Sequence, residues 1–142
     1  MHKLITIFIA SFFMVSCGKE DLTVALKSLS NGLSNLEWLS IAKSDNKSQG
    51  RSLYYDSSFN VYTVGQFSGT VSFDPNVSLD TFTSPGTYSM ILTKYNKDGV
   101  YLWSKVFGDA GTTYARPKDV RVDSSGNIII LGDFNGTIDA DP

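Results

Sequence analysis

The sequence predicts an all-β fold built from short antiparallel strands. From residue 38 onward, runs rich in β-branched and aromatic residues alternate with clusters of Asp, Asn, Ser and Gly, which is typical of strands joined by tight turns. The same region repeats itself, because the stretch 56–75 returns at 123–142 with an offset of 67 residues. A repeat of this length indicates a fold assembled from similar units that stack on one another.

The first 16 residues have the features of a targeting segment. Lys3 supplies a positive charge, residues 4–15 form an apolar run, and small residues flank Cys17, the single cysteine of the chain. The run is too short to span a membrane as a helix, which takes about 20 apolar residues. We therefore expect residues 1–16 to be a signal peptide.

This segment resembles the lipobox of bacterial lipoproteins, in which the cysteine thiol is joined to diacylglycerol and the bond before it is cut. The resemblance implies lipidation of Cys17 and a protein lipid-anchored to the bacterial cell envelope, at the outer membrane, facing the periplasm or the cell surface. Two or more acyl chains hold a protein stably on a membrane, because each buried methylene contributes about 0.8 kcal/mol. The alternative is an ordinary secretory peptide followed by a buried cysteine.

Cleavage before Cys17 narrows the available chemistry. It removes His2 and Lys3, so the mature chain has no histidine, and its basic residues fall from 12 to 11 against 14 acidic ones, a formal charge of −3. Acylation also consumes the thiol, which leaves no His or Cys for catalysis or metal binding and no disulfide. No basic stripe is present for nucleic acid. We expect no enzyme activity, no catalytic residue and no cofactor.

Residues 17–36 are predicted to be a flexible tether that follows the lipidated cysteine. They are rich in Ser, Asn and Gly. The alternative is one short amphipathic turn, because leucines recur among these residues with helical spacing. Gly32 weakens that alternative.

Residues 37–142 are predicted to hold the repeats. Unit one runs from about 38 to 102, and a partial unit two covers 103–142. Trp38 and Trp103 open the two units at an offset of 65, and a two-residue length difference absorbs the mismatch with the later offset. At the offset of 67, the structural repeat positions are the pairs Asp56 and Asp123, Gly65 and Gly132, and Asp74 and Asp141.

Strands are expected at 53–55, 61–65, 70–73, 90–95 and 101–107 in unit one, and at 119–122, 127–132 and 137–140 in unit two. Gly99 closes a hairpin loop over 96–99 with a positive φ. Residues 128–131 are apolar throughout, which predicts a strand covered on both faces. The four prolines are expected outside strands. Phe59 stands where the second copy has Gly126, which predicts a different turn.

The repeat resembles the bacterial β-propeller repeats labelled SBBP. Three stretches carry this resemblance in order and spacing: Gly-Gln-Phe-Ser-Gly-Thr-Val-Ser-Phe-Asp-Pro at 65–75, Phe-Thr-Ser-Pro-Gly at 82–86, and Lys-Tyr-Asn-Lys-Asp-Gly-Val-Tyr-Leu-Trp-Ser-Lys-Val-Phe-Gly at 94–108. It implies antiparallel β-propeller-like blades, of which about one and a half are present. Because propellers close with about 4 to 8 blades, we expect a fragment of a longer product or a chain that assembles with further blades or copies.

Two kinds of residue are candidate sites. Asp74, Asp139 and Asp141 are weak metal candidates, since calcium takes six to eight oxygen ligands and the local supply is two or three. Their recurrence favours turn capping instead. Trp38 and Trp103 have the rings to stack on sugars, but their shared place in the repeat favours core anchors.

The function expected from these features is that of a non-catalytic binding or scaffold module for protein or glycan, tethered to the envelope membrane. The alternative is a fragment of a larger propeller enzyme or sensor whose active residues lie in missing blades. Loops on propeller faces commonly present binding groups, so this expectation rests on analogy of fold.

Overall fold

The computed structural model describes residues 42–73 and 81–142, and in these ranges the chain forms strands and turns without a helix. The signal peptide 1–16, the tether 17–36 with Cys17, and the positions Trp38 and Asp74 lie outside the described residues. No helix of the described part is long and apolar enough to cross a membrane. The all-β prediction is confirmed for these residues.

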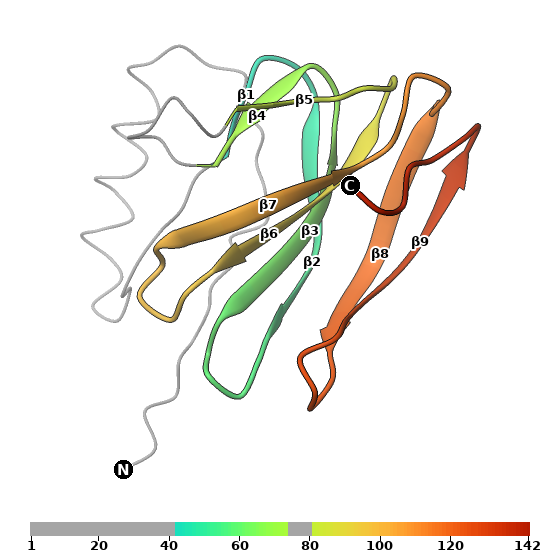
Figure 1. The fold of residues 1–142 in the computed structure, drawn as a ribbon. Coiled ribbons are helices and arrows are strands. Elements are labelled where there is room, and N and C mark those ends of the chain that lie inside the picture. Colours follow the sequence, from blue (N-terminus) through green and yellow to red (C-terminus); the bar gives the residue numbers. More distant parts are fainter. Residues whose placement is uncertain (1–41, 74–80) are drawn as a thin grey trace, which may run out of the picture. The chain divides into compact units, whose positions relative to one another are not determined.

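The strands of the described residues form three antiparallel sheets, none of which closes on itself (Figure 1). The largest sheet has the order β2 (Ser48–Tyr55), β3 (Val61–Phe67), β6 (Ser89–Tyr95) and β7 (Tyr101–Phe107). A hairpin follows, made of β8 (Tyr114–Val122) and β9 (Ile128–Asn135). The smallest sheet has the order β1 (Lys43–Ser44), β4 (Thr70–Ser72) and β5 (Thr81–Thr83).

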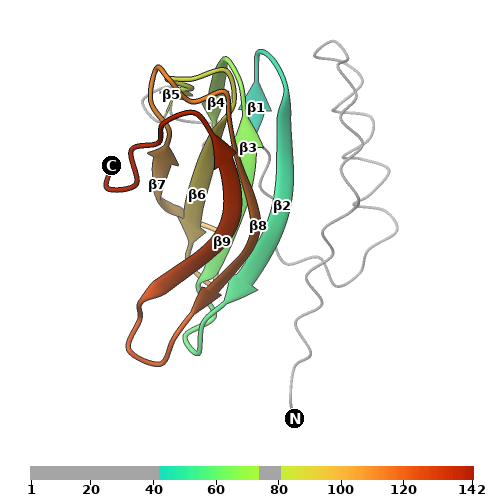
Figure 2. The same ribbon diagram turned by 90° about the vertical axis from the view of Figure 1, so that its right-hand side faces the viewer.

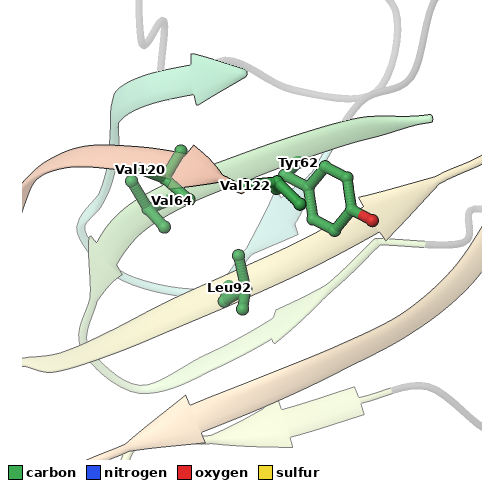
Figure 3. Packing of buried hydrophobic residues seen from close by; sticks show 5 residues of the cluster. All are labelled: Tyr62, Val64, Leu92, Val120 and Val122. Atoms are coloured by element: carbon green, nitrogen blue, oxygen red, sulfur yellow. The ribbon is translucent and has the colours of Figure 1, made fainter. Parts of the chain in front are cut away.

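The main core lies between the four-stranded sheet and the β8–β9 hairpin, which Figure 2 shows in front of that sheet. Tyr62 and Val64 of β3 and Leu92 of β6 meet Val120 and Val122 of β8 in one buried cluster (Figure 3). Along each strand the contributing residues are two apart, so they share one face. Full burial of such side chains contributes about 1.5–3 kcal/mol each, and this cluster therefore holds the hairpin on the sheet.

A second cluster attaches the small sheet to the opposite face of β3 and β6. Phe67, Val71 and Ile91 are buried there, with partly buried Phe82 and Val106 beside them. The two central strands, β3 and β6, therefore have buried side chains on both faces.

The β2–β3 and β8–β9 hairpins have the same register at the offset of 67. Tyr55 pairs with Val61 as Val122 pairs with Ile128, and every further pair down to the bulge coincides in the same way. The bulges also correspond, between Gly50 and Ser52 in β2 and between Pro117 and Asp119 in β8. The repeated sequence therefore folds twice into the same local structure.

The extra residue at each bulge is basic and reaches the same position of the neighbouring strand. Arg51 Nη2 donates to Gln66 Oε1 at 3.2 Å, and Lys118 Nζ lies 3.2 Å from Asp133 Oδ1. Gln66 and Asp133 are again 67 residues apart. Both pairs lie at the surface, where such contacts contribute little to stability.

The expectation that all four prolines lie outside strands is wrong for Pro117. This residue is buried within β8, at the edge of the bulge and opposite Gly132. A bulge interrupts the ladder, so the missing N–H of proline leaves no unsatisfied pair there. The same irregularity lets β8 begin at Tyr114, five residues earlier than expected.

The strand expected at 137–140 is absent, and β9 ends at Asn135. Its counterpart β4 is paired on both sides, by β1 and by β5. Thr137 instead forms hydrogen bonds with the loop 109–112. Its Oγ1 donates to Asp109 Oδ1 at 2.7 Å, and its carbonyl oxygen accepts a hydrogen bond from Thr112 Oγ1. Because strand formation depends on ladder partners, the same residue types become a loop here.

Candidate interaction surfaces

Exposed large hydrophobic side chains gather at three places in the described residues. One lies at the β6–β7 hairpin, with Val100 and Leu102. A second lies at the tip of the β2–β3 hairpin, with Tyr55 and Phe59. The third lies on the outer face of β9, with Ile129 and Leu131, and Phe134 is exposed on the other face near the end of that strand. No group of three or more potential metal-binding side chains is found in the described part of the chain, so these surfaces are the candidate sites.

The β9 surface is the counterpart of a face that is buried in the first hairpin. At the offset of 67, Ile129 and Leu131 correspond to Tyr62 and Val64, whose exposed fractions are 4% and 2%. Ile129 and Leu131 are 58% and 63% exposed. Tyr62 and Val64 of the first hairpin pack in one cluster with Val120 and Val122 of the second hairpin.

The expectation that residues 128–131 are covered on both faces is therefore wrong within the described residues. Ile128 and Ile130 pack against the main core, whereas Ile129 and Leu131 face outward. A strand with apolar residues on both faces is usually covered by other elements on both. In the described residues, only one face of β9 is covered. The outer face of β9 is an apolar surface that nothing in residues 42–73 and 81–142 covers.

Asp56 and Asp123 lie at the first position of equivalent turns. Asp56 Oδ1 accepts the backbone N–H groups of Ser58 and Asn60 at 2.9 Å, and Asp123 Oδ1 accepts those of Ser125 and Asn127 at 2.8 Å. The amide nitrogens of Asn60 and Asn127 donate to the second carboxylate oxygen at 2.8 Å. The carboxylates thus close the turns.

These hydrogen bonds lower the pKa of both carboxyl groups. Partial burial raises the pKa of Asp56, but the bonds from Asn60, Ser58 and Tyr62 outweigh it. For Asp123, the side-chain bond from Asn127 is the largest cause of the lowered pKa. A carboxyl with a lowered pKa stays ionised near neutral pH, which suits turn closure and does not suit a general acid.

The turn at Phe59 is the same as the turn at Gly126, contrary to the expectation of a different one. Phe59 N donates to Asp56 O at 2.9 Å, as Gly126 N donates to Asp123 O at 3.1 Å. Their φ angles are 61° and 85°. A left-handed conformation costs a residue with a side chain roughly 1–2 kcal/mol. Phe59 therefore holds a strained backbone where the second copy has glycine.

Gly99 confirms its predicted hairpin with φ 77° and a 3.0 Å bond from its N–H to Asn96 O. Gly65 and Gly132 serve another purpose. A Cβ at Gly65 would lie 2.6 Å from Gln49 O, and one at Gly132 would lie 2.6 Å from Arg116 O. Neighbouring backbone thus excludes any side chain at these two repeat positions.

Trp103 lies in β7 and packs against the main core. Its ring meets the edge of Tyr62 with the centroids 6.5 Å apart and the planes at 69°. This arrangement suits a structural ring. Its sequence counterpart Trp38 lies outside the described residues.

Asp139 and Asp141 are exposed residues near the C-terminus. Asp141 N donates to Asp139 Oδ1 at 3.0 Å, so Asp139 caps its own turn. Asp74, the third candidate, lies outside the described residues. The described residues bring no further carboxylate to this pair that would complete a cation site.

Sequence reasoning missed the polar contacts between the two hairpins. Ser52 Oγ donates to Asp119 Oδ1 at 2.8 Å, and the Arg121 guanidinium lies over the Tyr54 ring at 5.6 Å. Each contact joins residues that are 67 positions apart. The offset was the available signal, because units that stack in register bring equivalent positions together.

No protein-family model, curated protein or solved structure matches this chain.

Proposed function

We propose that this chain is a non-catalytic, lipid-anchored protein of the bacterial cell envelope whose repeats form propeller-like blades and act as a binding or scaffold module for protein or glycan. One observation carries the proposal: two hairpins of identical register lie against one another through equivalent residues. This is the arrangement that repeat proteins use to build extended binding surfaces.

The order of the larger sheet supports blade-like units. β2, β3, β6 and β7 follow one another as a four-stranded antiparallel sheet, and β8 begins the next unit against its face. Four-stranded antiparallel sheets stacked face to face are the building plan of propellers and of the SBBP-type repeats that the sequence resembles. The uncovered Ile129 and Leu131 then mark the face on which a further blade or another copy packs.

Five of the acidic residues have structural roles, which fits a binding or scaffold module. The pKa values of Asp45, Asp56, Asp109, Asp119 and Asp123 are all lowered by hydrogen bonds within turns and between strands. Each of these carboxylates is engaged in holding local structure. An enzyme that uses a carboxyl as proton donor near neutral pH needs a raised pKa instead.

Binding without turnover is the test of this function. The purified chain is incubated with peptidoglycan, with outer-membrane polysaccharide and with envelope proteins, and both sedimented complex and soluble products are measured. We expect saturable retention with no release of fragments above the rate without the chain. Chain-dependent release of products would favour the alternative of a propeller enzyme, and retention of none of the three materials would contradict the binding function.

The membrane anchor has a test of its own. Mass spectrometry of the amino terminus of the protein from membranes is expected to show a diacylated or triacylated Cys17, and Cys17→Ser is expected to lack the acyl mass and to accumulate as the uncleaved precursor. An unmodified terminus at another residue would overturn the lipid anchor.

A further inference from the structure

The aromatic pair Tyr55 and Phe59 at the tip of the β2–β3 hairpin has features that fold stability does not explain. Phe59 keeps φ 61°, whereas the equivalent residue of the second hairpin is Gly126. Side-chain burial offsets this strain only in part, because Phe59 is 48% exposed. Strained residues that are retained at the surface are concentrated at functional sites.

The two rings lie nearly parallel to each other. Their centroids are 6.2 Å apart with an angle of 10° between the planes, and Tyr55 is 54% exposed. Tyr54 continues the series, 6.2 Å from Tyr55 at 19°. The strained backbone and the ring pair meet in the same residue, Phe59.

From this geometry we infer that the Tyr55–Phe59 pair is a carbohydrate-binding platform, an inference that rests on the proposed binding function. Sugar rings present flat C–H faces that stack on aromatic rings, with hydroxyl groups at their rim. Ser57 and Ser58, both exposed, stand between the two aromatic residues in sequence and carry hydroxyl groups for that rim. Sites for small ligands combine apolar faces with a few polar groups in this way.

The size and charge of the platform favour a sugar over a protein partner. Large aromatic side chains bury about 150–250 Å² each, so two half-exposed rings offer far less than the roughly 800 Å² that a stable protein interface takes from each partner. Asp56, the one acid of the turn, already accepts bonds from Ser58, Asn60 and Tyr62. An uncharged sugar therefore meets carboxylate oxygens whose hydrogen bonds are already made within the turn.

The repeat supplies a variant that removes the ring without disturbing the turn. Phe59→Gly introduces the residue that the equivalent turn already has, and Phe59→Asn offers a second choice because Asn tolerates the left-handed region. Phe134→Ala removes a ring of similar exposure from another surface and is the matched control.

The experiment titrates the full chain with cellohexaose, chitohexaose and mannohexaose, followed by ligand-observed NMR and calorimetry. We expect saturable binding of at least one of them, weakened at least about tenfold in Phe59→Gly and Phe59→Asn, which corresponds to about 1.4 kcal/mol, and unchanged in Phe134→Ala. Thermal unfolding of both Phe59 variants is expected at or above the temperature of the unmodified chain.

Two results would overturn the inference while leaving the proposed function standing. One is a glycan affinity that changes by less than about twofold in both Phe59 variants, since the sugar then binds elsewhere. The other is failure of all three oligosaccharides up to about 10 mM together with retention of an envelope protein, since the module then serves a protein partner. Loss of all retention, in this experiment and in the envelope assay, would remove both.

Discussion

Ser52 and Asp119 occupy the same position in two copies of the repeat, and they bind each other directly. The Ser52 hydroxyl donates a 2.8 Å hydrogen bond to Asp119 Oδ1 across the contact between β2 and β8. Arg121 and Tyr54, two residues further along, are also equivalent and also in contact. The two strands therefore lie beside each other in step, and this contact is where the units join.

Removal of the Ser52 hydroxyl is expected to raise the pKa of Asp119. The bond from Ser52 is the largest cause of the lowered pKa of that carboxyl. Ser52→Ala should therefore move the pKa toward its ordinary value and lower the free energy of unfolding at neutral pH. NMR titration of the carboxyl carbon measures the first effect and urea unfolding the second. Ser124→Ala, an exposed serine of the second turn, is the control; an unshifted Asp119 pKa would show that the bond is not formed in solution.

Val120 is expected to contribute far more to stability than Leu131. Val120 is fully buried in the main core, so Val120→Ala loses two methyl groups and leaves a cavity, at a cost of about 2 kcal/mol. Leu131→Ala, at an exposed position of the same hairpin, should change the free energy of unfolding by less than about 0.5 kcal/mol. Urea unfolding of both variants checks this, and equal losses would contradict the placement of the core.

Gly126 is expected to resist substitution for conformational reasons alone. Its φ is 85°, and a Cβ would meet nothing within 4 Å, so Gly126→Ala should cost about 1–2 kcal/mol from backbone strain without a clash. Gly50→Ala is the control, because it also meets nothing within 4 Å but has no positive φ. It should be neutral or slightly stabilising. The two thermal unfolding curves should diverge, and a tolerated alanine at 126 would argue against the shared turn.

Stability is expected to fall in acid. In five aspartates the folded-state pKa is lowered from the ordinary value of 3.8, so between pH 4 and the folded values the unfolded chain binds more protons than the folded one. The stabilisation is fully present above the unfolded pKa and is lost as pH falls through the folded pKa values. Urea unfolding measured from neutral pH down to about pH 2 tests the sign. A free energy of unfolding that is constant or rises over this range would contradict it.

The outer face of β9 is expected to promote association. Ile129 and Leu131 form an exposed apolar face next to an unpaired strand edge, so the double variant Ile129→Ser and Leu131→Ser should reduce self-association without lowering stability by more than about 1 kcal/mol. Sedimentation velocity over a range of concentrations measures the effect. Tyr62→Ser is the contrasting change, since it opens the buried counterpart of that face and should destabilise strongly.

The fold could be predicted from the sequence in segments where one regular residue pattern, that of a strand between tight turns, extends over the whole segment. β7 has the expected bounds of 101–107, and Gly99 closes the loop before it as expected. The residues that resisted prediction depend on partners. Thr137 has the sequence of a strand but lacks the ladder of its counterpart Thr70, and Pro117 enters a strand only because a bulge relieves the ladder there.

The candidate surfaces were less predictable than the turns. Asp56 and Asp123 follow from local chemistry, because an aspartate before Ser and Asn closes a turn by itself. The outward position of Leu131 does not follow from local sequence, because it depends on which elements cover that face of the strand. The strained backbone of Phe59 does not follow either, because the left-handed position of the turn usually holds glycine. Amino-acid composition alone does not distinguish an aromatic ring that binds a ligand from one that packs in the core.

The bulge in β8 divides the strand into two halves with opposite parity. Ala115 and Pro117 point inward on one side of Lys118, and Val120 and Val122 point inward on the other. Deleting Lys118 would remove the bulge and leave plain alternation, because Pro117 stays opposite Gly132 and Asp119 stays opposite Leu131, so both halves keep their apolar side chains inward. Loss of this lysine should therefore be tolerated, whereas deletion of Arg121 would turn Val122 to the opposite face and should be as harmful as a core substitution. The number of residues in β8 is thus constrained on either side of the bulge and not at the bulge itself.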